Sequence, residues 1–297
     1  MGGDMDRFMI LLVTGLALGS VYGLVALGYS LIYKASGLLS LMQGDIMTLG
    51  AFLGITFYSF LGIPFWISLA LTIAVTFIFG MLIERGIIRT LARKGVHPGY
   101  IILATIAMAK IIQNGAGLIW GTIPLNFPSI FGVSTVQVVG INIQPEVLVA
   151  VGVSFLLMVG LHLFMTKTRV GTSMRAAAMD TKAAEACGID TSLSTGITWG
   201  LAAGIAAVGG MLVGPMYGVF TMLGANLGRR GFAAAVFGGF GNMYGAMVGG
   251  IVLGLLENFV AGYISSHFRN LFAFMVLLVF LFIKPTGIFN ERAIQDA

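Results

Sequence analysis

The chain is poor in charged residues. Only 9% of its 297 residues are Asp, Glu, Lys or Arg, whereas 58% are hydrophobic and the mean hydropathy is +1.00. A soluble domain usually carries about 25% charged residues, so the composition excludes an ordinary soluble domain. We expect an all-α protein that crosses a lipid bilayer several times.

Cysteine and histidine are also scarce. The single cysteine, Cys187, has no partner for a disulfide within the chain, and the three histidines lack the spacing of metal ligands. The 17 methionines follow the apolar positions of the expected helices, which favours packing over a path for metal ions. We therefore expect no bound metal, and we expect Cys187 to be a small buried residue.

Motifs for nucleic-acid binding, nucleotide binding and catalysis are missing. The net charge is +5, but the cations lie between apolar runs and form no basic stripe. The chain contains no G-x-x-x-x-G-K-[ST] sequence and no cluster of nucleophile, base or metal ligands. These absences predict that the chain binds no nucleic acid, is not an enzyme and holds no cofactor. If ATP drives the protein, another subunit binds that ATP.

Long apolar runs fill most of the sequence, and a helix of about 20 such residues crosses ~30 Å of hydrocarbon. The candidate spans are 8–33, 40–60, 65–84, 100–120, 146–165, 194–220, 243–262 and 270–284. The run 231–241 is too short to cross comfortably, so we expect a half-helix or re-entrant segment there, with a break near Gly241-Asn242. The sequence thus predicts eight or nine membrane segments.

Lysine and arginine collect in two connections between these runs, 84–99 and 166–193, whereas the connection 121–145 has none. Cytoplasmic loops carry the excess of these cations, so we expect the first two connections in the cytoplasm and the third outside. The N-terminus then lies outside and, with nine crossings, the C-terminus lies in the cytoplasm. Arg229 and Arg230 fall on the outer side in this scheme, against the rule.

The uncharged connection contains an alternating apolar pattern. The pattern includes Val136, Val138, Ile141 and Ile143, and it predicts a small β-hairpin. Such a hairpin either contacts a partner outside the membrane or caps a span.

Glycine is abundant, with 43 residues, and many glycines recur every four positions, on one face of a helix. The residues that we expect at close helix contacts are Gly15, Gly19, Gly23, Gly200, Gly204, Gly241 and Gly245. Alternatively, some of these glycines line sliding surfaces or let helices break around a pathway.

The connection 166–193 is the most informative polar segment. Its alanine-rich centre favours a helix, Thr172 or Ser173 can cap the start, and Gly188 can end it. A short surface helix with small residues and separated charges fits a groove on a partner protein. The alternative is a solvated loop between two spans.

Several motifs along the chain occur in an order typical of one family. They are Leu18-Gly-Ser-Val-Tyr-Gly-Leu-Val-Ala-Leu-Gly-Tyr29, Gln113-Asn114, Arg175-Ala-Ala-Ala-Met-Asp180 followed by 184–190, Gly214-Pro-Met-Tyr-Gly218, the glycine run 238–250, and Lys284-Pro-Thr-Gly-Ile288. Together they cover nearly the whole chain. The sequence resembles the branched-chain amino-acid ABC transporter permeases of the LivH type.

This resemblance implies a multi-pass subunit of a bacterial inner membrane that forms a translocation path with a homologous LivM-type permease. It also implies two cytoplasmic ATPases, which use ATP and Mg, and a periplasmic substrate-binding protein. The segment 166–193 would then couple the permease to an ATPase. The coupling residues that the resemblance indicates are Arg175, Asp180, Glu185 and Gly188.

Two ionisable residues stand inside expected spans, Lys110 and Glu257. A charge at membrane depth is costly and is a functional candidate. An ion pair between the two would lower that cost, and a role near the pathway is the alternative. Glu257 matches a glutamate of the resembling family, whereas Lys110 stands where that family usually has an apolar residue. Two such groups are thin support for a secondary transporter or a channel.

The segment 40–45, Ser-Leu-Met-Gln-Gly-Asp, aligns with a family stretch that usually reads Asn-Phe-Ala-His-Gly-Glu. Asp45 either supplies a charge at the start of a helix or helps to shape the pathway. Because the histidine is missing, substrates of related systems, such as urea, short amides or aromatic acids, remain alternatives to branched-chain amino acids. The pathway candidates are Gln43, Asp45, Gln113, Asn114, Glu257 and Asn258.

Overall fold

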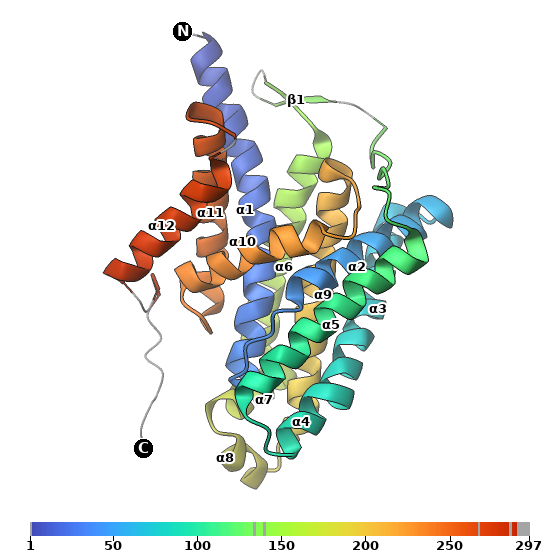
Figure 1. Ribbon diagram of the computed structural model, residues 1–297, viewed down its shortest axis with the longest axis vertical. Helices are drawn as coiled ribbons and strands as arrows, with labels where there is room; N and C mark the ends of the chain where they lie inside the picture. Colours follow the sequence, from blue (N-terminus) through green and yellow to red (C-terminus); the bar gives the residue numbers. More distant parts are fainter. Residues whose placement is uncertain (1, 133–134, 139–140, 267, 285–286, 290–297) are drawn as a thin grey trace.

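The computed structural model describes residues 2–132, 135–138, 141–266, 268–284 and 287–289, and this part of the chain is mostly helical (Figure 1). The helices are α1 (Gly2–Ser36), α2 (Gln43–Ile55), α3 (Phe65–Ile83), α4 (Arg89–Arg93), α5 (Pro98–Trp120), α6 (Pro145–Lys167), α7 (Arg169–Met179), α8 (Thr181–Ala186), α9 (Thr191–Tyr217), α10 (Leu223–Gly238), α11 (Met243–Tyr263) and α12 (Arg269–Ile283). Two π-helical turns, η1 (Thr56–Phe60) and η2 (Glu84–Ile88), extend α2 and α3.

Six helices of the described chain are long and apolar enough to cross a membrane. They are Met5–Ser36, Phe65–Arg93, Pro98–Trp120, Pro145–Lys167, Thr191–Tyr217 and Met243–Tyr263. Each coincides with one of the spans expected from the sequence. The other two expected spans are also helical but shorter, since α2 with η1 covers 43–60 and α12 has 15 residues. The prediction of an all-α, polytopic membrane protein is confirmed, and the count of eight or nine segments is approximate.

Helix α9 lies at the centre of the bundle, because 89% of its most apolar 18-residue stretch is buried. Helix α1 packs along α11, and the small residues of both helices make the contact close. A Cβ atom on Gly19 would lie 2.8 Å from the Cα of Ile251, and one on Gly15 would lie 3.2 Å from the Cα of Leu255. Gly23 faces α11 in the same way, at Met247. The glycines at four-residue spacing therefore let two backbones approach each other.

Gly200 and Gly204 form a second close contact, between α9 and α3. A Cβ atom on Gly200 would lie 2.9 Å from the ring of Phe77, and one on Gly204 would lie 3.3 Å from Ile73. Gly245 packs against Gly238 of α10. Gly241 differs from the expectation, because it lies in the turn before α11 with φ 87°, beside the ring of Tyr33, and not on a helix face.

The short strands β1 (Val136–Val138) and β2 (Ile141–Ile143) pair antiparallel, with Val136 opposite Ile143. The expected hairpin is therefore present. It lies at the same end of the molecule as the start of α1, while α4, α7 and α8 lie at the opposite end (Figure 1). The connection without cations and the two basic connections are thus at opposite ends of the bundle.

Helix α10 runs across the bundle rather than along it (Figure 1). It begins at Leu223, earlier than the run 231–241 suggested, and it ends at Gly238. The expected break follows, with φ 104° at Gly239, and Asn242 caps α11 by accepting a hydrogen bond from the amide of Gly245 at 3.0 Å. The break near Gly241-Asn242 is confirmed. It arises because glycine tolerates positive φ and asparagine satisfies a free amide at a helix start.

Candidate functional site

A cavity of about 470 Å³ lies where α2 and α10 cross, with α5 beside them. The crossing is close because Gly44 and Gly224 face each other, and a Cβ atom on either would overlap the carbonyl oxygen of the other. The hydroxyl of Thr48 accepts a hydrogen bond from the amide of Gly224 at 2.8 Å. These contacts join the N-terminal halves of α2 and α10, and they bring polar residues of both helices to one cavity.

Charges of both signs line this cavity. Asp45 comes from the first turn of α2 and is 8% exposed. Lys110, from the middle of α5, donates a hydrogen bond to Gln113 at 2.8 Å, and Arg229 of α10 donates one to Asn226 at 2.8 Å. All these side chains are among the lining residues. The cavity thus brings together two of the pathway candidates, Asp45 and Gln113, with Lys110 and Arg229.

The ion pair that the sequence suggested between Lys110 and Glu257 does not form, so that expectation is wrong. Glu257 is fully buried and pairs with Arg230, whose Nε lies 3.4 Å from Oε1. The hydroxyl of Tyr22 donates to Oε2 of Glu257 at 3.0 Å, and it accepts from Nη1 of Arg230 at 2.8 Å. The cluster joins α1, α10 and α11. It forms because α10 crosses α1 near Val25, where Gly231 packs.

Both arginines of α10 have polar surroundings within the bundle, although Arg229 is exposed. Arg229 lines the cavity and Arg230 binds Glu257. Their conflict with the positive-inside rule was the signal that the sequence offered. Charged side chains in an apolar segment usually face a partner group or a water-filled space.

The remaining pathway candidates serve contacts between or within helices. Nε2 of Gln43 donates to the carbonyl oxygen of Ala202 at 2.5 Å, and Gln43 is buried. Nδ2 of Asn258 donates to Leu11 at 3.0 Å, which ties α11 to α1. Asn114 is exposed and donates to the carbonyl oxygen of Lys110 at 2.8 Å.

The segment 166–193 forms two helices, so the expectation of one is wrong. Thr168, and not Thr172 or Ser173, caps α7 by accepting from the amide of Gly171 at 3.0 Å. Asp180 ends α7 and begins α8, because its extended backbone breaks the helix and its Oδ1 accepts from the amide of Ala183 at 3.0 Å. Gly188, with φ 81°, ends α8 as expected.

The expected coupling residues differ in their surroundings. Arg175 is exposed on α7, and beside it Met179 is 81% exposed, which is unusual for a large apolar side chain. Glu185 instead points toward α9, where its Oε1 accepts from the hydroxyl of Thr191 at 2.6 Å. Cys187 is exposed at the end of α8, contrary to the expectation of a buried residue, because α8 lies on the surface.

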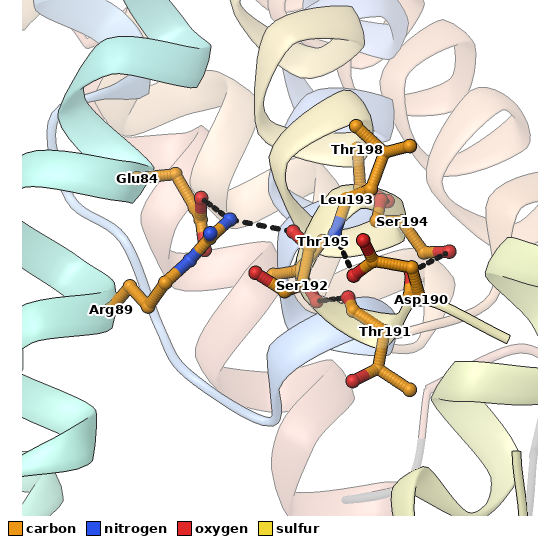
Figure 2. A network of polar contacts seen from close by, with 9 residues as sticks. All are labelled: Glu84, Arg89, Asp190, Thr191, Ser192, Leu193, Ser194, Thr195 and Thr198. Carbon is orange, nitrogen blue, oxygen red and sulfur yellow. Dashed lines mark hydrogen bonds and ion pairs between the residues drawn. The ribbon is translucent and has the colours of Figure 1, made fainter. Parts of the chain in front are cut away.

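A polar network next to these helices was not expected from the sequence (Figure 2). Glu84 is 3% exposed and forms two hydrogen bonds with Arg89, at 2.6 and 3.0 Å. The same guanidinium donates to the carbonyl oxygen of Ser192 at 2.6 Å (Figure 2). The two partners are five residues apart, a spacing that shares a face only in a π-helical turn such as η2. The network joins η2 to the start of α9.

A cavity of about 490 Å³ borders this network. The ends of α1 and α4, the helices α7 and α8 and the first turn of α9 all contribute to its lining. The elements at this end of the bundle therefore meet around one space, where Arg89 of α4 links η2 to α9.

The chain matches the family model described as "Branched-chain amino acid transport system / permease component" over residues 11–283. It is 34% identical to the high-affinity branched-chain amino acid transport system permease protein BraD of Pseudomonas aeruginosa, over 98% of this chain and 99% of that protein. It is 30% identical to LivH of Escherichia coli and 29% identical to LivH of Salmonella typhimurium, over 97% of each chain.

Among solved structures, PsaBC from Streptococcus pneumoniae in complex with Fab is similar, with a TM-score of 0.50 and 16% identity. The match covers 93% of this chain and 91% of that one, and it shows a shared fold. The curated relatives are transport permeases. From the family match and the near full-length similarity, this chain belongs to the permease components of branched-chain amino acid transport systems.

Proposed function

We propose that the chain is the membrane permease subunit of an ATP-driven importer for branched-chain or related amino acids in a bacterial inner membrane. The observation that carries the proposal is the 34% identity to BraD over 98% of this chain. Similarity of this extent includes the helices of the bundle and the segment 166–193. The permease performs no chemistry of its own, binds no cofactor and acts as one transmembrane permease domain.

The partners in this proposal are a homologous LivM-type permease, two cytoplasmic ATPases that use ATP and Mg, and a periplasmic substrate-binding protein. The basic end of the bundle, with α7 and α8, faces the cytoplasm in this arrangement, and the hairpin end faces the periplasm. The N-terminus is then periplasmic and the C-terminus cytoplasmic. The distribution of cations between the connections supports this orientation.

The coupling surface consists of Arg175 and Met179, which α7 exposes at the basic end. An apolar side chain beside a cation suits the groove of a partner protein. Asp180 and Gly188 shape this surface by breaking the helices, and Glu185 links it to α9 through Thr191. A movement of the bound ATPase would therefore reach α9, the most buried span.

The translocation path in this proposal passes the cavity between α2, α5 and α10. The support is the set of charged side chains that line it at membrane depth, because a charge there is stable only beside water or a partner group. Asp45 and Gln113 belong to this path, whereas Asn258 and Glu257 hold helices together.

The test is reconstitution of the complete complex in proteoliposomes, with ATP inside and the binding protein outside. Accumulation of labelled leucine, isoleucine or valine that requires both would support the proposal. A complex with an inactive ATPase is the control. Uptake that does not depend on ATP would indicate a secondary transporter or a channel. Preferred uptake of urea, a short amide or an aromatic acid would change the proposed substrate class.

A further inference from the structure

We propose that the cavity between α2, α5 and α10 binds a zwitterionic amino acid, with Asp45 holding the ammonium group and Lys110 and Arg229 holding the carboxylate. This inference rests on the proposed function and deepens it. It makes the permease itself, and not only the soluble binding protein, selective for the amino-acid headgroup.

The first argument concerns the two cations. Lys110 lies in the middle of α5 and Arg229 lies on α10, and both side chains are exposed. An exposed cation at membrane depth is unfavourable against lipid, so it faces a watery space or another charged group. Both residues line the same cavity, which supplies that space.

The second argument concerns the anion. Asp45 is largely buried, yet its side chain also lines the cavity. Within the part of the chain that the structure describes, Asp45 forms no ion pair with either cation; both of them bind neutral amides on their own helices instead. Asp45 and Lys110 still attract each other electrostatically, but the three charged groups all face the shared cavity, where a ligand can contact them.

The chemistry of a zwitterion complements this arrangement. Its ammonium group requires an acceptor such as a carboxylate, and its carboxylate requires cationic donors, of which the planar guanidinium of Arg229 offers a bidentate geometry. A neutral amide or urea would bring no charge that complements those of the cavity. A simple anion or cation would satisfy one sign only.

The uncharged part of the lining suits the side chain of such an amino acid. It includes Ile106, Ala109, Met222, Phe232 and Phe274. A ligand site usually combines an apolar wall with a few placed polar groups. This apolar wall therefore favours an aliphatic side chain, as in leucine, isoleucine or valine.

The experiment compares leucine uptake by the complete complex carrying Asp45→Asn, Lys110→Gln or Arg229→Gln. Each variant should raise the KM for uptake or lower its maximal rate by about ten- to a hundredfold, the effect expected for one charge-assisted hydrogen bond. ATP hydrolysis stimulated by the binding protein should persist. The conservative variant Asp45→Glu should recover part of the uptake, because it keeps the charge.

Glu146→Gln is the matched control. Glu146 is also a buried carboxylate in the first turn of a helix, α6. It accepts a hydrogen bond from the amide of Ile130 and is not among the residues that line the cavity. Its substitution should leave the KM for leucine unchanged. If the Asp45→Asn complex fails to assemble, the Lys110→Gln variant tests the site instead. Lys110 is exposed, so its replacement opens no cavity in the core.

The outcomes separate the two proposals. A wild-type complex that imports leucine, together with Lys110→Gln and Arg229→Gln variants of unchanged KM and rate, would overturn the headgroup site and leave the proposed function standing. A wild-type complex that imports no amino acid would overturn the proposed function and this inference with it. Equal loss of uptake and of stimulated ATP hydrolysis in every variant would mean a structural role, and would also overturn the site.

Discussion

Arg230 of α10 and Glu257 of α11 form an ion pair inside the bundle, with 3.4 Å between Nε and Oε1. The hydroxyl of Tyr22 bonds to both side chains, so the pair also ties α1 to these two helices. Glu257 is completely buried and Arg230 is 19% exposed. The pair therefore fixes the position of α10, which crosses the bundle and carries Arg229 to the cavity.

Replacing Glu257 by Gln should destabilise the protein rather than change its selectivity. The substitution leaves the charge of Arg230 without its partner carboxylate, and breaking such a buried pair typically costs about 3 kcal/mol. The apparent Tm of the purified protein should fall, as measured by thermal unfolding in detergent. The double variant Glu257→Gln/Arg230→Met should regain part of the loss. A Glu257→Gln protein with wild-type Tm and altered uptake would instead favour a pathway role.

Replacing Gly19 by Ala should separate α1 from α11. The new methyl group would lie 2.8 Å from backbone atoms of Ile251, which cannot move aside without shifting the helix. Such overpacking costs about 1–3 kcal/mol, and the Tm should fall accordingly. Gly152→Ala is the control, since a Cβ atom at Gly152 of α6 meets nothing within 4 Å. That variant should be neutral or slightly more stable because alanine favours the helix.

Replacing Arg89 by Lys should weaken the link between η2 and α9. A lysine keeps the charge but lacks the planar fork that contacts Glu84 and the carbonyl oxygen of Ser192 at the same time. We expect ATP hydrolysis by the complex to continue with less uptake per ATP consumed. Both rates are measured in the same proteoliposomes. Arg85→Lys, at an exposed cation of the same turn, should behave as wild type.

Replacing Met179 by Glu should weaken binding of the ATPase. The side chain is 81% exposed on the proposed coupling surface, and an acid there would be desolvated in an apolar groove. Less ATPase should co-purify with the permease, while membrane insertion and Tm stay unchanged. Ile123→Glu is the control, because Ile123 is 77% exposed in the connection between α5 and the hairpin. Unchanged co-purification of the Met179 variant would remove this residue from the interface.

The exposed Cys187 offers a test of orientation. It is the single cysteine of the chain, so a maleimide modifies one known position at the end of α8. We expect a membrane-impermeant maleimide to label it in inside-out vesicles and not in right-side-out vesicles. Added ATPase should slow the labelling. Labelling from the periplasmic side would reverse the proposed topology.

Much of the helical architecture was predictable from local pattern. The six long spans follow from hydropathy, and the break at Gly241-Asn242 follows from glycine content. The helical faces of Gly15, Gly19 and Gly23 follow from their spacing. The division of 166–193 into α7 and α8 was not predictable in this way, because alanine propensity favours one helix and the side chain of Asp180 competes for the backbone locally.

The candidate site was predictable only in part. Asp45 and Gln113 do line one cavity. Gln43 lies only two residues before Asp45, yet its side chain is buried and donates a hydrogen bond to Ala202 instead. Which face of a short helix meets a cavity depends on how the neighbouring helices cross it. Arg229 was missed because the cavity that it lines is formed together with residues of other helices. Glu84 was missed because its partner Arg89 is brought beside it by a π-helical turn.

The sequence by itself determined that this protein is a helical bundle within a bilayer. A chain with so few charges lies in the hydrocarbon of a bilayer, where its backbone hydrogen bonds must be made within the protein. An α-helix makes all of these bonds within itself, so its formation does not depend on which helices surround it. Only the tertiary structure decided which ionisable groups meet. The choice of Arg230 over Lys110 as the partner of Glu257 follows from the crossing of α10 over α1, since the energy of an ion pair depends on distance in space.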